Sequence, residues 1–385
     1  MRVLNVCTSS DPRMGGGTGE RTLRMSLFLA QNHVECTLLE LAFSRLATTE
    51  RYDRGVRVIS LPCILKRLYV PAFSLRLLKR LVKEADIIHL IGHWTLLNAI
   101  VCLLARWAGR PYVICPAGAL PIYGRSRLAK KAYNLVIGRS LVRGAAAHIA
   151  ITEDEVAHFA AYGVARRDVV IIPNAIDGRS FMTCADDGFR QRHNLPEARL
   201  VLFLGRLNTI KGPDLLLEAF AKVATAVSQY HLVMAGPDGG LLAKLLARTK
   251  ELCLSDRVHY VGYLGAEDRV QAYKASDLLV IPSRQEAMSI VVLEAGACGK
   301  PVLITDRCGF PQAAEVRGGM VVPATVEGLQ EGLTLLLRYP EHLQLMGLNL
   351  RDYVLAVHAW DVIIERFICL YQMILSSPAG ERTQR

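Results

Sequence analysis

Short apolar runs alternate with longer amphipathic stretches along this chain of 385 residues, and the alternation occurs twice. Such a pattern is typical of strands joined by helices in a parallel sheet. In the first half it predicts strands near Arg2–Cys7, Glu35–Leu39, Val56–Ser60, Ile87–Leu90, Tyr112–Cys115 and His148–Ile151. In the second half it predicts strands near Leu200–Gly205, His231–Ala235, Val258–Val261, Leu278–Ile281, Pro301–Ile304 and Gly319–Val322. We therefore expect two α/β domains with a cleft between them.

A turn and a linker separate the two halves. Pro173–Asp177 combines a proline with Asx residues, which suits a turn that leaves a strand, and the linker is expected to run to about Pro196. Glu341–Ser376 has helical periodicity, whereas Ser377–Arg385 is expected to be disordered. The predicted parts are an N-terminal domain of residues 1–177, a C-terminal domain of residues 178–355, and a crossover helix with a tail over residues 356–385, the helix returning to the N-terminal domain.

The basic excess of the chain lies in its first half. The net charge is +11; residues 1–180 hold 25 Lys and Arg against 13 Asp and Glu, a balance of +12, which leaves −1 for residues 181–385. Basic amphipathic helices of this kind are attracted to anionic lipid headgroups, although solvated helix faces have the same pattern. Few aromatic residues and no recognition motif argue against nucleic-acid binding. The cations concentrate in two stretches, Lys66, Arg67, Arg76, Lys79, Arg80 and Lys83, then Arg125, Arg127, Lys130, Lys131, Arg139 and Arg143.

The ten cysteines are scattered without a CxxC pair, so we expect reduced thiols and no metal site. The apolar run at the N-terminus is too short for a signal peptide. The longest apolar stretch, Thr95–Trp107, is interrupted by Asn98 and Arg106 and falls short of the ~20 residues that a bilayer span needs. These features predict a cytoplasmic protein, with peripheral association at the inner face of a membrane as an option.

Two segments of the second half carry candidate chemistry. Leu204–Gly212 follows a predicted strand and precedes a helix expected from about Pro213, and its Arg206 and Lys211 can converge on one anion. A diphosphate needs two such cations where no metal neutralises it. A solvated pair of surface charges has the same spacing and stays an alternative.

The second segment, Ile281–Pro301, has the pattern of a strand, a loop, a helix from about Ser289 and another strand. A helix start at this place directs backbone N–H groups and a positive dipole end toward a phosphate. Glu286 lies in the loop and Glu294 in the helix. Eight residues at helical rise span about 12 Å, which lets one carboxylate reach each end of a nucleotide sugar, unless Glu294 is an ordinary exposed helix residue.

In combination these motifs resemble the donor domain of family 4 retaining glycosyltransferases, the group 1 type. The family signature is Glu-x7-Glu, here Glu286 and Glu294, preceded by Gly-Arg-Leu-x-x-x-Lys-Gly, here Gly205 to Gly212. Shorter pieces follow in family order: Ala235–Gly239, Val261–Tyr263, Ala275–Asp277 and Glu294–Pro301. The resemblance spans about Pro173 to Pro323. It implies the GT-B fold, two facing Rossmann-like domains, with the nucleotide-sugar donor on the C-terminal domain.

The N-terminal half resembles the family more loosely. Gly15–Gly19 resembles its glycine-rich loop, which approaches the donor phosphates and the acceptor. Asp86–Trp94 resembles a histidine-containing segment with Ile91 where a second histidine is expected. Cys115–Leu120 resembles a Pro-(Arg or His)-Gly-Met-Leu segment, with Ala117 at the basic position. On the acceptor side the candidates are His93 and Gly118, although a histidine beside Trp94 is more often packed than catalytic.

The resemblance implies transfer of a hexosyl group from a UDP- or GDP-linked sugar to a carbohydrate or lipid-linked acceptor, with retention and without a metal or other cofactor. Such reactions belong to cell-surface, exopolysaccharide or lipopolysaccharide biosynthesis in bacteria. Glu286, Arg206 and Lys211 are the expected catalytic residues. The expected donor-binding residues are Gly16, Gly17, Gly205, Arg206, Lys211, Gly236, Glu286, Met288, Ser289, Ile290 and Glu294.

Three other functions stay open. A nucleotide-sugar epimerase or hydrolase of the same fold needs no carbohydrate acceptor. A non-catalytic membrane-associated module that binds sugar nucleotides is expected to lose Arg206, Lys211 or Glu286, and all three are present. A dinucleotide-dependent oxidoreductase is disfavoured because Gly17–Thr22 lacks the third small residue of its fingerprint.

Overall fold

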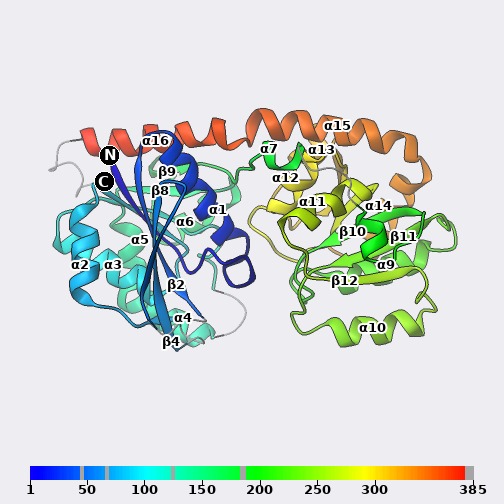
Figure 1. The fold of residues 1–385 in the computed structure, drawn as a ribbon, viewed down its shortest axis with the longest axis horizontal. Helices are drawn as coiled ribbons and strands as arrows, with labels where there is room; N and C mark the ends of the chain where they lie inside the picture. The colour runs from blue at the N-terminus through cyan, green and yellow to red at the C-terminus, as the bar shows by residue number, and fades with distance from the viewer. Residues whose placement is uncertain (44–46, 66–68, 123–125, 183–187, 378–385) are drawn as a thin grey trace. The chain divides into compact units, whose positions relative to one another are not determined.

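The structure is a computed structural model that describes residues 1–43, 47–65, 69–122, 126–182 and 188–377. The chain forms two compact units (Figure 1): unit 1 comprises residues 1–174 and the segment from Trp360 onward, and unit 2 comprises residues 175–359. The boundaries placed at residues 177 and 355 from sequence stay predictions. The tail expected to be disordered lies, beyond Ser377, outside the described residues.

Unit 1 is built on a mostly parallel sheet with the strand order β3-β4-β2-β1-β6-β7-β8-β9, and β5 pairs with β4. Strands β3 and β5 run antiparallel to β4 at one edge. The central strands are buried apolar runs, as expected for parallel strands that helices cover on both faces. The strands are β1 (Arg2–Val6), β2 (Glu35–Ala42), β3 (Thr49–Asp53), β4 (Val56–Leu65), β5 (Val70–Pro71), β6 (Ile87–Ile91), β7 (Tyr112–Cys115), β8 (Ala147–Ala150) and β9 (Val169–Ile171).

Helices cover both faces of this sheet, and Figure 1 shows α2 and α3 on one side of the strands and α1 on the other. Side-chain caps define the starts of α2 and α3, because Ser74 accepts from the Leu77 N–H and Thr95 from the Asn98 N–H. The helices of unit 1 are α1 (Pro12–Gln31), α2 (Leu75–Glu84), α3 (Leu96–Trp107), α4 (Arg127–Tyr133), the π-helix η1 (Asn134–Gly138), α5 (Arg139–Arg143), α6 (Asp154–Ala160), the 3-10 helix η2 (Arg166–Asp168) and α16 (Trp360–Ser376).

Helix α16 brings the end of the described chain back to the N-terminal domain, as predicted. It packs on α1, where Trp360 stacks on Phe28 with ring centroids 5.9 Å apart. Further along α16, the buried Tyr371 hydroxyl lies 2.7 Å from Nδ1 of His89. Burial lowers the pKa of His89 to about 3, so this histidine is a neutral core residue at neutral pH.

Unit 2 is built on an all-parallel sheet with the order β12-β11-β10-β13-β14-β15. Its core combines side chains of the strands with one face of α9 and α14. The strands are β10 (Arg199–Leu204), β11 (Tyr230–Ala235), β12 (Val258–Gly262), β13 (Leu278–Ile281), β14 (Val302–Thr305) and β15 (Gly319–Val322). The helices are α7 (Arg179–Met182), α8 (Phe189–Arg192), α9 (Pro213–Val223), α10 (Leu242–Glu251), α11 (Ala266–Ala275), α12 (Ile290–Ala297), α13 (Gln312–Glu315), α14 (Val326–Arg338) and α15 (Pro340–Val357).

All twelve predicted strands are present in the structure with small shifts at their ends. The sequence pattern missed β3, β5 and β9. The prediction of a glycine-rich loop after β1 is wrong. Gly15–Gly19 lies within α1, and the helix is interrupted only at Gly16, which has a non-helical backbone. No helix among the described residues is long and apolar enough to cross a membrane.

Replacing Trp360 with alanine should destabilise unit 1, because it removes a fully buried indole that stacks on Phe28 between α16 and α1. Phe or Trp to Ala changes in a core cost about 3–5 kcal/mol in the free energy of unfolding. Urea denaturation followed by circular dichroism measures the loss. Tyr52→Ala, at an exposed position of the same unit, is the control and should change stability by less than ~0.5 kcal/mol; equal effects for the two variants would contradict the packing described for α16.

Candidate functional site

The candidate donor site lies where the strand order of unit 2 reverses. The chain proceeds from β10 through β11 to β12 on one side, and then returns so that β13 pairs with β10. In open α/β sheets, ligands bind outside the carboxyl ends of the strands at this switch point. Here the two carboxyl ends lead into the loops of residues 205–212 and 282–289, which hold the residues singled out from the sequence.

An ion pair joins these two loops. Lys211 Nζ lies 2.8 Å from Glu286 Oε1, and the Ser283 hydroxyl donates to the same oxygen. The Glu286 N–H donates to the Arg307 carbonyl at 2.8 Å, which fixes the glutamate beside the loop after β14. The structure thus brings together two of the predicted catalytic residues, at hydrogen-bond distance.

The third predicted catalytic residue, Arg206, is exposed and lies on a backbone held against the loop after β11. The Gly205 N–H donates to the Ala235 carbonyl at 2.9 Å, and Leu207 forms a bridge with Asp238. Close approach requires glycine at Gly236, since a Cβ there would lie 1.9 Å from the Gly205 carbonyl oxygen and φ is +142°. This packing keeps Arg206 near the carboxyl ends of β10 and β11, in the same loop as Lys211.

Helix α12 begins directly after the Glu286 loop, as the sequence predicted. Ser289 is its N-cap residue, and the first turn contains no acidic residue to compensate the positive end of the helix dipole. The Ser289 hydroxyl is buried and has no hydrogen-bond partner within the described residues. Met288 is also buried, and Ile290 is half-buried. An anion at this helix start therefore meets a favourable dipole, and a hydroxyl is available to it.

Glu294 is not an exposed helix residue. Its carboxylate is buried on α12, where it pairs with Arg269 at 3.0 Å and accepts from the Tyr273 hydroxyl at 2.6 Å. Burial, with the Glu294 charge as the next cause, raises the pKa of Tyr273 well above its usual value. The ribose contact expected of Glu294 stays a prediction, and its two partners on α11 are residues that the sequence reasoning missed.

The acceptor-side candidates lie in unit 1 around its own switch point, where β1 pairs with β6. Gly16 has φ +57° and interrupts α1, and Gly17 is exposed beside it. His93, just after β6, is buried. Its Nε2 lies 3.0 Å from Oδ1 of Asn134, and burial lowers its pKa to about 4. His93 is therefore neutral and packed, and a direct role in the reaction stays a prediction.

Gly118 belongs to a loop after β7 that takes up left-handed backbone at Ala117 and Gly118, with φ of +49° and +84°. The buried Glu155 carboxylate accepts from the Gly118 N–H and, at 2.7 Å, from the Ile151 N–H. Burial is the main cause that raises the pKa of Glu155. Nothing in the local spacing of the sequence links Glu155 to this loop, because the contact forms only when β7 and β8 pair.

Several residues that were not predicted from the sequence hold the predicted site residues, or their loops, in place. Ser283 holds Glu286, Arg284 pairs with Asp214 at 2.6 Å and so ties the Glu286 loop to α9, and Asn134 holds His93. Among the described residues there is no group of three or more His, Cys, Asp or Glu side chains arranged to hold a metal ion.

Comparison with known families accounts for both units. Residues 186–352 match the family described as glycosyl transferases group 1, and residues 16–175 match the glycosyl transferase 4-like domain. Together the two glycosyl transferase matches cover most of the chain, one in each unit. The candidate site of unit 2 lies within the first match, and the acceptor-side candidates lie within the second.

Individual relatives of this chain match over part of their length. A mannosylfructose-phosphate synthase of Agrobacterium fabrum is 35% identical over 162 residues, 40% of this chain and 36% of the relative. A D-inositol 3-phosphate glycosyltransferase of Segniliparus rotundus is 31% identical over 206 residues, 52% of this chain and 46% of the relative. The chain thus spans less than half the length of these curated relatives.

Solved structures resemble this chain over nearly its whole length. A sucrose-phosphate synthase of Thermosynechococcus elongatus gives a TM-score of 0.78 at 19% identity, covering 98% of this chain and 100% of the other. Anabaena HepE in complex with UDP-glucose gives a TM-score of 0.74 at 18% identity, covering 97% of this chain and 100% of the other. Likeness at this level of identity establishes the fold, which is GT-B, as predicted.

Replacing Gly212 with alanine should disturb the junction of the two donor-site loops. A Cβ on Gly212 would lie 2.1 Å from the Pro282 carbonyl oxygen, at a φ of +69°. Gly240 has a similar backbone, with φ +101°, but open space around its Cβ position. Since both substitutions carry the left-handed strain, the difference between them isolates the clash. We expect Gly212→Ala to lower the free energy of unfolding by at least ~1 kcal/mol more than Gly240→Ala in urea denaturation; no difference would contradict the described contact.

Proposed function

We propose that the chain transfers a hexosyl group from a UDP- or GDP-linked sugar to a carbohydrate or lipid-linked acceptor, with retention of the anomeric configuration. The observation that carries the proposal is the Lys211–Glu286 ion pair beside the start of α12, at the switch point of unit 2. A cation, a carboxylate and a positive helix end at one place suit a sugar diphosphate, which has an anionic part and a hydroxylated part.

In the proposed reaction, negative charge develops on the diphosphate as the bond to the sugar breaks. Lys211, Arg206 and the start of α12 stabilise that charge from fixed positions, which is a preorganised electrostatic role. The buried Ser289 hydroxyl supplies a further donor at the same helix start. These groups supply the neutralisation for which other enzymes use a divalent metal, so the proposed transfer requires none.

Glu286 is proposed to bind hydroxyls of the transferred sugar once the diphosphate attracts Lys211. Its backbone contact to Arg307 and the hydroxyl of Ser283 hold the carboxylate in place. We propose a same-face, ion-pair-like transfer rather than a double displacement, because the one carboxylate of the loop of residues 282–289, that of Glu286, is assigned to the sugar hydroxyls and not to nucleophilic attack. Glu294 is proposed to bind ribose hydroxyls, and it would then lose part of its present contacts with Arg269 and Tyr273.

The setting that we propose is bacterial cell-surface or exopolysaccharide biosynthesis at the cytoplasmic side of a membrane. Support comes from the basic excess of the first half of the chain and from UDP and UDP-glucose complexes among proteins of the same fold.

Nucleotide binding tests the donor site. Among UDP, GDP and ADP, one nucleotide should raise the melting temperature of the protein in a thermal-shift assay, equally with Mg²⁺ and with a chelator. Arg206→Ala and Lys211→Met should each weaken binding at least about tenfold, since each removes a charge-assisted contact to phosphate. Arg338→Ala, at an exposed arginine of the same unit, is the control; a shift that needs Mg²⁺, or that both variants retain, would contradict the site.

Product stereochemistry tests the reaction. With sugar nucleotides of the base identified by binding as donors, ¹H NMR of early reaction products should show the anomeric configuration of the donor. Glu286→Gln should lower turnover at least about 100-fold while nucleotide binding persists. Glu331→Gln, on an exposed face of α14, should react like wild type. Release of the inverted anomer would exclude retention, and conversion of the donor to an epimer would favour the epimerase alternative.

A further inference from the structure

Helix α12 holds a carboxylate in the interior of unit 2. Every residue from Val292 to Ala297 is buried, and Glu294 is the titratable residue among them. Its side chain is only 2% exposed. A carboxylate is costly to transfer from water to such a place unless other groups compensate its charge. The groups that compensate Glu294 therefore also decide where its two oxygens point.

Two side chains of α11 bind these oxygens, one each. The Arg269 guanidinium Nη1 lies 3.0 Å from Oε1 of Glu294, and the Tyr273 hydroxyl donates to Oε2 at 2.6 Å. Arg269 and Tyr273 are four positions apart, so they lie on one face of their helix. The carboxylate is thus gripped from two successive turns of α11.

The two partners approach Glu294 from different sides. Helices α11 and α12 follow β12 and β13, so both begin at the carboxyl edge of the sheet, where the donor is proposed to bind. Arg269 lies in the first turn of α11, and Tyr273 lies one turn, about 5 Å, further from that edge. The Arg269 side chain is 20% exposed, whereas Tyr273 is fully buried. Arg269 therefore has room to move on the ligand side, and Tyr273 has none.

Tyr273 is a permanent donor to the carboxylate. Burial, followed by the charge of Glu294, raises the pKa of its hydroxyl well above the usual value, so the hydroxyl keeps its proton at any pH at which the protein functions. A hydrogen bond to a charged group is also stronger than one between neutral groups. Tyr273 thus fixes one oxygen of Glu294 whether or not a ligand is present.

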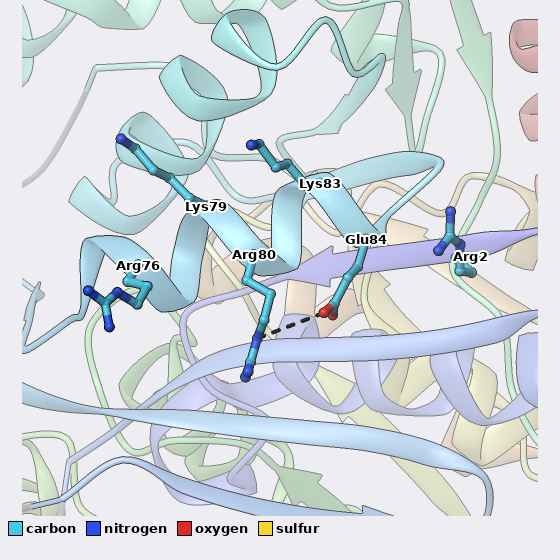
Figure 2. A pocket seen from close by; sticks show the side chains of 6 residues that line it. All are labelled: Arg2, Arg76, Lys79, Arg80, Lys83 and Glu84. Carbon is cyan, nitrogen blue, oxygen red and sulfur yellow. Dashed lines mark ion pairs between the residues drawn. The ribbon is translucent and has the colours of Figure 1, made fainter.

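An exposed ion pair of unit 1 provides a contrast. Figure 2 shows Arg80 and Glu84 of α2, which are 3.8 Å apart with side chains 57% and 48% exposed. They line an open hollow of about 450 Å³ with Arg2, Arg76, Lys79 and Lys83. Exposed pairs of this kind contribute little, because water and salt screen them, whereas the pair of Arg269 and Glu294 is largely shielded from water. Of the other basic residues singled out from the sequence, Lys66, Arg67 and Arg125 lie outside the described residues.

We propose that Tyr273 positions Glu294 for the donor by holding Oε2 in place, while Arg269 yields Oε1 to the ribose hydroxyls of the bound nucleotide. Tyr273 itself does not touch the donor, so it is a positioning residue. The inference rests on the proposed function, and it makes the site selective for ribonucleotides. A 2′-deoxyribose lacks one of the hydroxyls that replace the Arg269 contact, so it leaves the buried carboxylate less well satisfied.

Calorimetric titration of the full chain tests this selectivity with UDP, GDP and ADP and their 2′-deoxy counterparts. The wild type should bind its preferred ribonucleotide at least about tenfold more tightly than the 2′-deoxy form, because the missing contact is a hydrogen bond to a charged group. Tyr273→Phe should lower this ratio of dissociation constants at least about threefold. The matched control is Tyr230→Phe, which removes a hydroxyl that is buried in unit 2 without a hydrogen-bond partner among the described residues, and it should keep the ratio.

Two further variants show whether Tyr273 acts through Glu294. Glu294→Gln should also lower the ratio, and adding Tyr273→Phe to it should lower the ratio no further, because both substitutions disturb one interaction. Arg269→Lys keeps the positive charge and the Tyr273 contact. It should therefore keep the ratio, whatever its effect on the two separate affinities.

The outcomes separate this inference from the proposed function. Equal weakening of both nucleotide forms by Tyr273→Phe is the effect of a merely structural role and overturns the inference. A wild type that binds both forms equally, or an Arg269→Lys variant that loses the ratio, overturns it as well. Should Tyr273→Phe bind neither form because it does not fold, a ratio kept by Glu294→Gln overturns the inference. A wild type that binds none of the six nucleotides overturns the proposed function instead.

Discussion

The pairing of β10 with β13 is the constraint on which the candidate donor site depends. Because β13 returns to the side of β10 that β11 leaves free, two loops separated by about seventy positions in the sequence meet at one sheet edge. The loop after β10 supplies cations, and the loop after β13 supplies a carboxylate and a helix start. Neither loop by itself provides both the cations and the carboxylate of a sugar diphosphate site.

Backbone packing gives this site its rigidity. At Gly212 and Gly236, a single added carbon would lie within about 2 Å of a neighbouring carbonyl oxygen, so the loops approach one another more closely than side chains allow. The Arg284–Asp214 pair and the contact from Glu286 to Arg307 then hold the second loop against α9 and β14. Charges fixed in this way need little reorganisation when charge develops on a bound ligand.

Much of the fold followed from the sequence because buried parallel strands are short apolar runs with helices between them. Strand β3 was missed because it is an exposed edge strand without an apolar run. Strand β5 was missed because it has only two residues. The glycine-rich segment was predicted as a loop from its resemblance to the family's glycine-rich loop, but only Gly16 departs from helical geometry in α1.

For the site, spacing indicated Arg206, Lys211, Glu286 and Ser289, because these residues lie near strand ends that sequence patterns locate. Spacing did not show that Glu294 is buried with Arg269 and Tyr273, or that Glu155 holds the Gly118 loop. Both contacts join elements that only the tertiary structure brings together. The packed state of His93 depends likewise on Asn134, forty-one positions away.

The most direct measurement of the central claim is a crystal structure of the protein with the nucleoside diphosphate that binds it. We expect a phosphate within hydrogen-bond distance of Lys211 Nζ and of the first turn of α12, with the Lys211–Glu286 contact lengthened. A nucleotide bound elsewhere on the chain, with that ion pair intact and the start of α12 unoccupied, would contradict it.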